Sequence, residues 1–430
     1  MATLLSISIA ALAGLFMTRL FKPLKLPDVT AYIVAGILVG PYFLGRLGVP
    51  GLGFAEGSTG SLALISDIAL GFIAFSIGNE LRLEELKHTG RRAAIIGVVQ
   101  ALAAALLVDL SLLGVHLLFP EKLTAAQAIT LGSIATATAP AATLMVVRQY
   151  KAKGGLTDLL LPIVALDDAV GLVVFAVSFG AAKSMVLGGA DAAVMLLNPL
   201  IEIGASLLLG ALMGVILTYL ERFFHSNTNR LSLTIVFVFL TVALSKLSLP
   251  LGKFTLGFSP LLVCMMLGTV FCNICVLASD LMERADKWTA PLFTLFFVIS
   301  GAELNVTADS AIVLIGLVYI LFRSLGKYLG AFVSAKATGC DKTICDNLGI
   351  TLLPQAGVAL GMCLTAAELG EQGMLIRNIV LFSVLVYELI GPPMTKWALT
   401  RSGDIRPMSD DVKNRRAQKL EKALAERSAK

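Results

Sequence analysis

The sequence has few charged residues. Only 15% of its 430 residues are Asp, Glu, Lys or Arg, whereas soluble domains carry about 25%. Hydrophobic residues make up 57% of the chain, and the mean hydropathy is +0.86. No polar stretch before Pro392 exceeds about 20 residues, so none is long enough to build a second core. These shortages exclude an ordinary soluble globule and predict one membrane domain at 1–400, followed by a short basic tail at 401–430.

Histidine and cysteine are scarce as well. His88, His116 and His225 fall in predicted loops or at helix ends, which argues against a histidine metal site. The six cysteines lie in apolar segments or in a loop expected on the cytoplasmic side, so a secreted disulfide framework is not predicted. Cys272 and Cys275 form a lone CxxC; a redox or metal pair is one interpretation, and two small hydrophobic side chains is the other. The N-terminus lacks a basic n-region and an A-x-A site, so we expect a first spanning helix there.

Long apolar runs recur from the N-terminus to Leu399. Crossing the hydrocarbon core takes about 20 such residues. Splitting the runs at charged or Pro/Gly-rich breaks predicts helices at 2–21, 28–46, 60–80, 92–118, 124–148, 157–181, 196–221, 231–249, 255–278, 288–304, 309–336, 345–369 and 374–397. The predicted fold class is therefore an all-α polytopic membrane protein with about 13 transmembrane helices.

Lysine and arginine are distributed unevenly between the two sets of loops. An odd number of crossings places the termini on opposite sides, and the side richer in Lys and Arg is cytoplasmic. Most of the 34 such residues lie in the tail and in one alternating set of loops. The other set holds only Arg46, Lys122, Lys183, Lys246, Lys253 and Arg377. We expect a cytoplasmic C-terminus, an external N-terminus and, in a bacterium, an inner-membrane location. Basic residues spread over separate loops predict no nucleic-acid partner.

Two adjacent carboxylates lie deep inside a predicted spanning helix. Asp167 and Asp168 sit near the middle of the helix at 157–181, too far from either loop to reach water. An ionised side chain in hydrocarbon costs several kcal/mol, so it needs a partner or a function. Successive helical residues point about 100° apart, so the two carboxylates have different surroundings. We expect one to face a water-filled cavity and the other to pair with a cation.

The available cation is Lys327, in the predicted helix at 309–336, with Arg323 one turn before it on the same face. The alternative is that Lys327 snorkels to the cytoplasmic surface. That surface lies about 13 Å along the helix, which exceeds the reach of a lysine. Lys327 is therefore predicted to pair with one of the two aspartates.

Other polar residues inside the predicted helices are harder to interpret. Glu388 and Arg323 should both lie toward the cytoplasmic half, which suggests a structural bridge between them. Gln100 and Asp109 either meet each other's hydrogen-bonding needs in a shared neighbourhood or line a crevice. Asp67 and Glu202 carry no clear prediction.

Two predicted helices contain a proline and polar residues near their middle. Pro140 removes a backbone donor, and nearby Thr138 offers a hydroxyl to the freed groups. Pro354 and Gln355 repeat this design in the helix at 345–369. A proline kink is the alternative for either one alone. If the seventh helix is a linker, each break falls in the fifth helix of a six-helix half, as in inverted repeats whose broken helices cross at the midplane.

The combination of motifs resembles the monovalent cation:proton antiporter-2 family over essentially the whole membrane region. LPDVTAYIVAGILVGPYFLG is similar to the second helix of that family and LALISDIALGFIAFSIGNELRLEEL to its third. Asp167-Asp168 matches its double-aspartate motif, and Lys327 matches its G-K-x-x-G lysine. The segments around Pro140 and Pro354 match its two unwound helices.

The resemblance implies a core domain that holds the crossed broken helices and moves like an elevator against a dimerisation domain, in a homodimer. It implies that Asp168 binds the monovalent cation, that Asp167 pairs with Lys327 in the ion-free state, and that Thr138 lends a hydroxyl or carbonyl. Relatives carry Thr-Asp-Pro where this chain has Thr138-Ala139-Pro140, so the site is less acidic and the choice of cation stays open. The residues after Thr395 are too few for the nucleotide-binding domain of many relatives, so no cofactor or nucleotide gating is predicted.

Together these features predict a secondary transporter and not an enzyme. It would exchange sodium, or alternatively potassium or lithium, for protons by competition at a buried aspartate, electrogenically if two protons pass per cation. A passive cation channel is a rival, but the sequence has no selectivity-filter loop or acidic rings. An organic-anion symporter is disfavoured because two aspartates beside one lysine repel an anion. A non-transporting sensor lacks a recognisable signalling domain.

Overall fold

The computed structural model describes residues 2–24, 28–49, 52, 59–187, 192–247, 249–251, 254–302, 304 and 310–405. Its elements are α1 (Ala2–Phe21), α2 (Asp28–Val39), α3 (Thr59–Glu80), α4 (Leu83–Leu118), α5 (Ala125–Ile134), α6 (Pro140–Tyr150), α7 (Gly155–Leu187), α8 (Ala192–Glu221), α9 (Asn227–Ser245), β1 (Leu249–Leu251), β2 (Phe254–Leu256), α10 (Pro260–Ile274), α11 (Ala278–Ala302), α12 (Ser310–Ala337), α13 (Lys342–Thr351), α14 (Val358–Ala366) and α15 (Glu371–Arg401), with short 3₁₀ turns at Lys22–Leu24, Leu44–Leu47 and Ala367–Leu369. Residues 406–430 of the predicted tail lie outside the described residues.

Within the described residues the regular secondary structure is helical apart from one pair of short strands. Strands β1 and β2 pair antiparallel, with Leu249 opposite Leu256. The predictions of helix up to residue 249 and from residue 255 are wrong at these ends. Pro250 lacks the backbone donor that a helix needs, and α10 begins only at Pro260, after the Ser259 cap. Eight of the described helices are long and apolar enough to cross a membrane. The figure of thirteen crossings stays a prediction.

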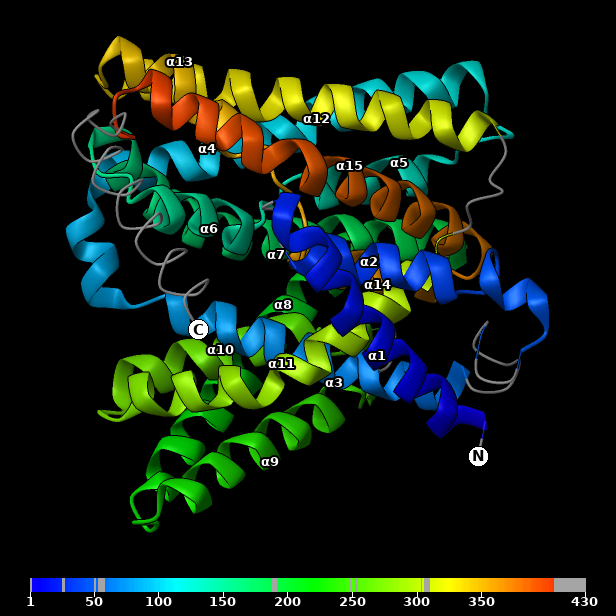
Figure 1. The fold of residues 1–430 in the computed structure, drawn as a ribbon, viewed down its shortest axis with the longest axis vertical. Coiled ribbons are helices and arrows are strands. Elements are labelled where there is room, and N and C mark those ends of the chain that lie inside the picture. The colour runs from blue at the N-terminus through cyan, green and yellow to red at the C-terminus, as the bar shows by residue number, and fades with distance from the viewer. Residues whose placement is uncertain are drawn as a thin grey trace, which may run out of the picture.

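The helices pack as two groups. In one group α12 lies along α4 and α13, α5 packs on α4 and α7, and α15 contacts α13 and α14. In the other, α3 packs on α10, α10 on α8, and α11 on α2. Figure 1 shows α4, α12, α13 and α15 along the upper edge and α8 to α11 in the lower part. Contacts between α7 and α8 join the two groups.

Glycines allow the closest helix crossings of the second group. A Cβ on Gly301 of α11 would lie 2.2 Å from the carbonyl oxygen of Ile33 in α2. A Cβ on Gly78 of α3 would lie 1.9 Å from the carbonyl oxygen of Met265 in α10. In membranes such small residues let backbones touch, and dispersion contacts then hold the helices together.

We therefore expect Gly301→Ala to lower the thermal unfolding temperature of the detergent-solubilised protein. The added methyl meets backbone atoms, which cannot rotate away, so α2 and α11 must separate at a cost of about 1–3 kcal/mol. Gly114→Ala in α4 is the control, since a Cβ there meets nothing within 4 Å. Equal unfolding temperatures for the two variants would contradict the close crossing.

Candidate functional site

Two interrupted helices meet in the middle of the first group. Helix α5 ends at Ile134, six residues before Pro140, which is the first residue of α6 and needs no donor there. Helix α13 ends at Thr351, and α14 begins at Val358. The two connecting segments touch, because the backbone N–H of Ala139 donates to the carbonyl of Pro354 at 2.9 Å. Both prolines therefore lie where a helix stops and restarts, and not at a simple kink.

Gln355 joins the second break to the first. Its Nε2 donates to the carbonyl of Ile134, the last residue of α5, at 3.0 Å. The same nitrogen donates to the hydroxyl of Tyr319 at 2.9 Å, and its Oε1 accepts from Ser383 at 3.4 Å. The side chain is fully buried. Gln355 thus acts as a structural link between the breaks.

Arg323 holds the carbonyl ends of both broken helices. Its guanidinium donates to the carbonyls of Ala135 at 3.1 Å, Ala137 at 2.6 Å and Leu353 at 2.7 Å. It also lies 4.4 Å from the ring centre of Tyr387. The last carbonyls of a helix have no helical partner and carry partial negative charge. Ala135 caps the end of α5, and Ala137 and Leu353 lie just beyond α5 and α13. The buried guanidinium therefore supplies hydrogen-bond donors and positive charge at the ends of both helices.

The predicted bridge between Arg323 and Glu388 is absent. Both side chains are buried, but the Arg323 donors go to the three carbonyls, and neither carboxyl oxygen of Glu388 has a hydrogen-bond partner among the described residues. The physical reason is that unpaired backbone carbonyls from two breaks converge on the guanidinium. The positions of Arg323 and Glu388 in the sequence did not indicate that these carbonyls would converge there.

Lys327 and Asp167 form a buried ion pair. The Nζ of Lys327 lies 2.6 Å from Oδ2 of Asp167, and both side chains are 0% exposed. The ammonium also donates to the hydroxyl of Thr138 at 2.9 Å and to the carbonyl of Thr136 in the first break. Thr138 in turn donates to Oδ2 of Asp167. The structure therefore brings together Asp167, Lys327 and Thr138, which the sequence had singled out.

Gln100, which the sequence left ambiguous, belongs to the site, and its contact with Asp167 was not predicted. Its Nε2 donates to Oδ1 of Asp167 at 2.6 Å and to the carbonyl of Gly97 at 2.9 Å. Asp109 lies about 13 Å further along α4 and packs against Gly132 of α5, so these two residues do not share a neighbourhood. The signal in the sequence was a polar amide within an otherwise apolar, Ala-rich stretch of α4.

Asp168 is fully buried on α7, next to Asp167 in the chain. Gly171 lies about one turn after both aspartates, and a Cβ there would lie 2.8 Å from the hydroxyl of Thr136. This part of α7 therefore packs against the first break. Carboxylate, hydroxyl and backbone carbonyl oxygens thus gather here, which is the ligand type that hard monovalent cations take. Within the described residues no group of three or more His, Cys, Asp or Glu could hold a metal ion.

The start of α7 is fixed by Asp404, three residues beyond the end of α15. Oδ2 of Asp404 accepts from the backbone N–H of Thr157 at 2.7 Å and from its hydroxyl at 2.8 Å. The N–H of Lys153 donates to the carbonyl of Asp404 at 3.0 Å. A carboxylate at a helix N-terminus satisfies free N–H groups and the helix dipole. This contact anchors the helix that carries both aspartates.

A cavity of about 460 Å³ opens beside the same helix, toward the end opposite Asp404. Phe175 and Phe179 of α7 line it, together with Glu202 of α8. At its rim Lys183 pairs with Glu368 at 3.1 Å. Phe175 is seven residues from Asp168, about 10 Å along the helix, so the cavity approaches the buried carboxylates.

Comparison with known proteins gives a consistent result. A family model described as sodium/hydrogen exchanger, transmembrane, matches residues 7–401. The high-affinity Na⁺/H⁺ antiporter NhaS3 of Synechocystis is 23% identical over 417 residues, covering 86% of this chain and 84% of that protein. Cation/H⁺ antiporter 20 of Arabidopsis thaliana is 42% identical over 84 residues, but this match covers only 10% of the plant protein. The solved structure of the sodium proton antiporter MjNhaP1 from Methanocaldococcus jannaschii has a TM-score of 0.71 at 17% identity, over 94% of this chain and 99% of that one.

Proposed function

Because this chain belongs to the sodium/hydrogen exchanger family, we propose that it exchanges a monovalent cation, sodium first, for protons at the carboxylates beside the two helix breaks. The family assignment confirms the antiporter resemblance seen in the sequence. The observation that carries the proposal is the buried pair of Asp167 and Lys327 where the breaks meet, with Asp168 as the next residue.

Exchange follows from competition at Asp168. A buried carboxyl group without a cation is more stable protonated and neutral, because desolvation disfavours the charged form. A dehydrated cation instead needs the negative carboxylate and further oxygens, which Thr138 and the nearby carbonyls supply. The site therefore holds the cation or the proton and never both. No covalent chemistry is required.

A second proton comes from the ion pair. Lys327 is held by Asp167, Thr138 and the carbonyl of Thr136. If Asp167 turns to the bound cation, Lys327 loses its counterion and releases a proton from its buried position. Two protons then cross for each cation, and one net charge moves per cycle.

The contact pattern supports an inverted repeat of two six-helix halves. With α8 as the linker, α2 corresponds to α10, α3 to α11, α4 to α12, α5 to α13 and α7 to α15. Under this correspondence the contact of α2 with α11 becomes that of α10 with α3. The correspondence also maps α4 with α5 onto α12 with α13, and α4 with α7 onto α12 with α15. We assign the group containing α4, α5, α7 and α12 to α15 as the moving core. The group containing α1 to α3 and α8 to α11 is then the dimerisation part of a homodimer.

The cavity beside α7 fits an access path in this arrangement. It lies between helices of the two groups, and its lining includes the charged side chains Glu202, Glu368, Lys183 and Lys246, so it is polar enough to hold water. Its rim belongs to the side poor in Lys and Arg, opposite the proposed cytoplasmic C-terminus. In a bacterial inner membrane the cavity would therefore face outward.

The experiment uses proteoliposomes that contain a pH-sensitive dye. We expect external sodium to dissipate an imposed pH gradient, with potassium and lithium compared at equal concentrations, and the rate to change with an imposed membrane potential. Uphill sodium accumulation driven by the pH gradient excludes a channel. If none of the three cations moves protons, the exchange proposal fails. If flux occurs but ignores the potential, the ratio of two protons per cation is wrong.

A further inference from the structure

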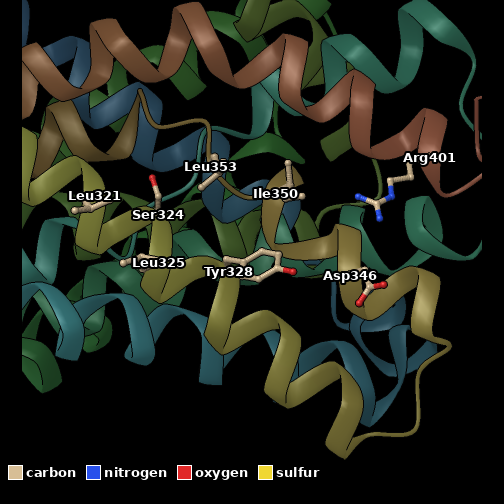
Figure 2. A pocket seen from close by; sticks show the side chains of 8 residues that line it. All are labelled: Leu321, Ser324, Leu325, Tyr328, Asp346, Ile350, Leu353 and Arg401. Carbon is tan, nitrogen blue, oxygen red and sulfur yellow. The ribbon is translucent and has the colours of Figure 1, made fainter.

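A second cavity lies on the outside of the core group, away from the aspartates. It has a volume of about 540 Å³ and is lined by Leu321, Ser324, Leu325, Tyr328, Asp346, Ile350, Leu353 and Arg401. These residues come from α12, from α13 and the break that follows it, and from the last turn of α15. Figure 2 shows Arg401 and Asp346 at one end, Leu321 and Leu325 at the other, and Tyr328 between them. The cavity is thus charged at one end and apolar at the other.

The apolar end opens beside a lipid-facing helix surface. Leu321, Leu325, Leu329 and Val333 follow one another at four-residue spacing on α12, and they are between 40% and 58% exposed. Apolar side chains at this spacing form one stripe along a helix. On a membrane protein an exposed stripe of this kind contacts acyl chains. The medium that reaches the cavity is therefore lipid.

The charged end has the chemistry of a membrane interface. The guanidinium of Arg401 lies 5.2 Å from the ring centre of Trp397, which is 49% exposed. Trp and Arg side chains commonly mark the headgroup level. Among the described residues neither Arg401 nor Asp346 takes part in an ion pair. One cation and one anion are therefore available at the same end of the cavity.

From this charge pattern we propose that the cavity binds a phospholipid with an ethanolamine headgroup. Arg401 holds the phosphate, Asp346 accepts from the primary ammonium, and an acyl chain lies along Leu321 and Leu325 toward Leu353. An anionic glycerol headgroup offers no ammonium to Asp346. A choline headgroup offers a positive charge but no N–H donor.

Such a lipid would cover the back of the second helix break. Leu353 lines the cavity, and its carbonyl accepts from Arg323 at 2.7 Å. An acyl chain there keeps water from the side of the break that faces away from the aspartates. The binding site itself does not depend on the proposed exchange activity.

Native mass spectrometry of the detergent-solubilised protein tests the proposal. Titration uses phosphatidylethanolamine, phosphatidylcholine and phosphatidylglycerol with the same acyl chains. We expect the wild type to bind the ethanolamine lipid most tightly. Arg401→Gln should weaken binding of the ethanolamine and glycerol lipids alike, by about tenfold, since a charge-assisted contact to phosphate is lost. Asp346→Asn should remove only the preference between them.

Three further variants separate this site from general effects. Leu325→Trp fills the apolar end and should lower binding of every lipid without changing charge. Arg222→Gln and Asp158→Asn, at exposed positions elsewhere, should change nothing. Equal affinity for all three lipids, or affinities untouched by Arg401→Gln and Leu325→Trp, overturns the proposal. It is equally overturned if those two variants shift the balance of monomer and dimer while lipid binding stays constant, because the cavity would then be an interface between copies.

Discussion

Asp168→Asn is expected to abolish cation-dependent proton flux in proteoliposomes while the protein still folds. Asparagine has nearly the same shape, but it carries no negative charge for a cation and no titratable proton. Because Asp168 is fully buried, no nearby solvent can replace either function. We expect the flux to fall to the level of empty liposomes, at least a hundredfold below wild type.

Asp167→Asn serves as the matched comparison for this variant. It leaves Lys327 buried without its counterion, which costs about 3–5 kcal/mol. We therefore expect a clear loss of thermal stability for Asp167→Asn and little loss for Asp168→Asn. If Asp168→Asn retains flux while Asp167→Asn loses it, the roles of the two carboxylates are reversed.

Arg323→Met is expected to be the most destabilising single change at the breaks. Methionine fills much of the same volume, but it leaves the carbonyls of Ala135, Ala137 and Leu353 without their donor. Each buried unsatisfied group costs about 1–3 kcal/mol, so the total should be at least about 3 kcal/mol. Thermal unfolding in detergent measures the loss. Arg323→Lys should recover only part of it, because a single ammonium cannot span both breaks.

Glu388→Gln distinguishes this explanation from a salt bridge. Neither carboxyl oxygen of Glu388 has a hydrogen-bond partner among the described residues, so replacing the carboxyl group by an amide of the same shape should leave the unfolding temperature unchanged or slightly higher. If Arg323 were instead held by Glu388, the two substitutions would destabilise by similar amounts. A large decrease in the unfolding temperature of Glu388→Gln would contradict the assignment of Arg323 to the backbone carbonyls.

The interpretation of the sequence succeeded where membrane burial makes a residue's chemistry expensive. Asp167 and Lys327 stood out because ionised groups in hydrocarbon require partners, and they form a buried pair. The cation-binding role of Asp168 stays a prediction. Pro140 and Pro354 stood out because a missing donor must be compensated there. It failed where the outcome depended on which backbone groups converge, as with Arg323 and Glu388. It left the role of Gln100 open, since nothing in one sequence says which amide faces a carboxylate on another helix.

The sequence by itself determined the class of this protein. Its hydropathy and the order of its motifs specify an all-helical membrane protein, and they predicted the antiporter family before any contact was known. The family resemblance implied that Asp167 pairs with Lys327, and the structure contains this pair. Only the tertiary structure decided that Arg323 donates to carbonyls at the ends of α5 and α13, and that Gln100 donates to Asp167. The reason is that hydrophobicity and helix breaking are local properties of the chain. Partner choice is set by how helices distant in sequence cross, and those crossings depend on close contacts such as the one at Gly301.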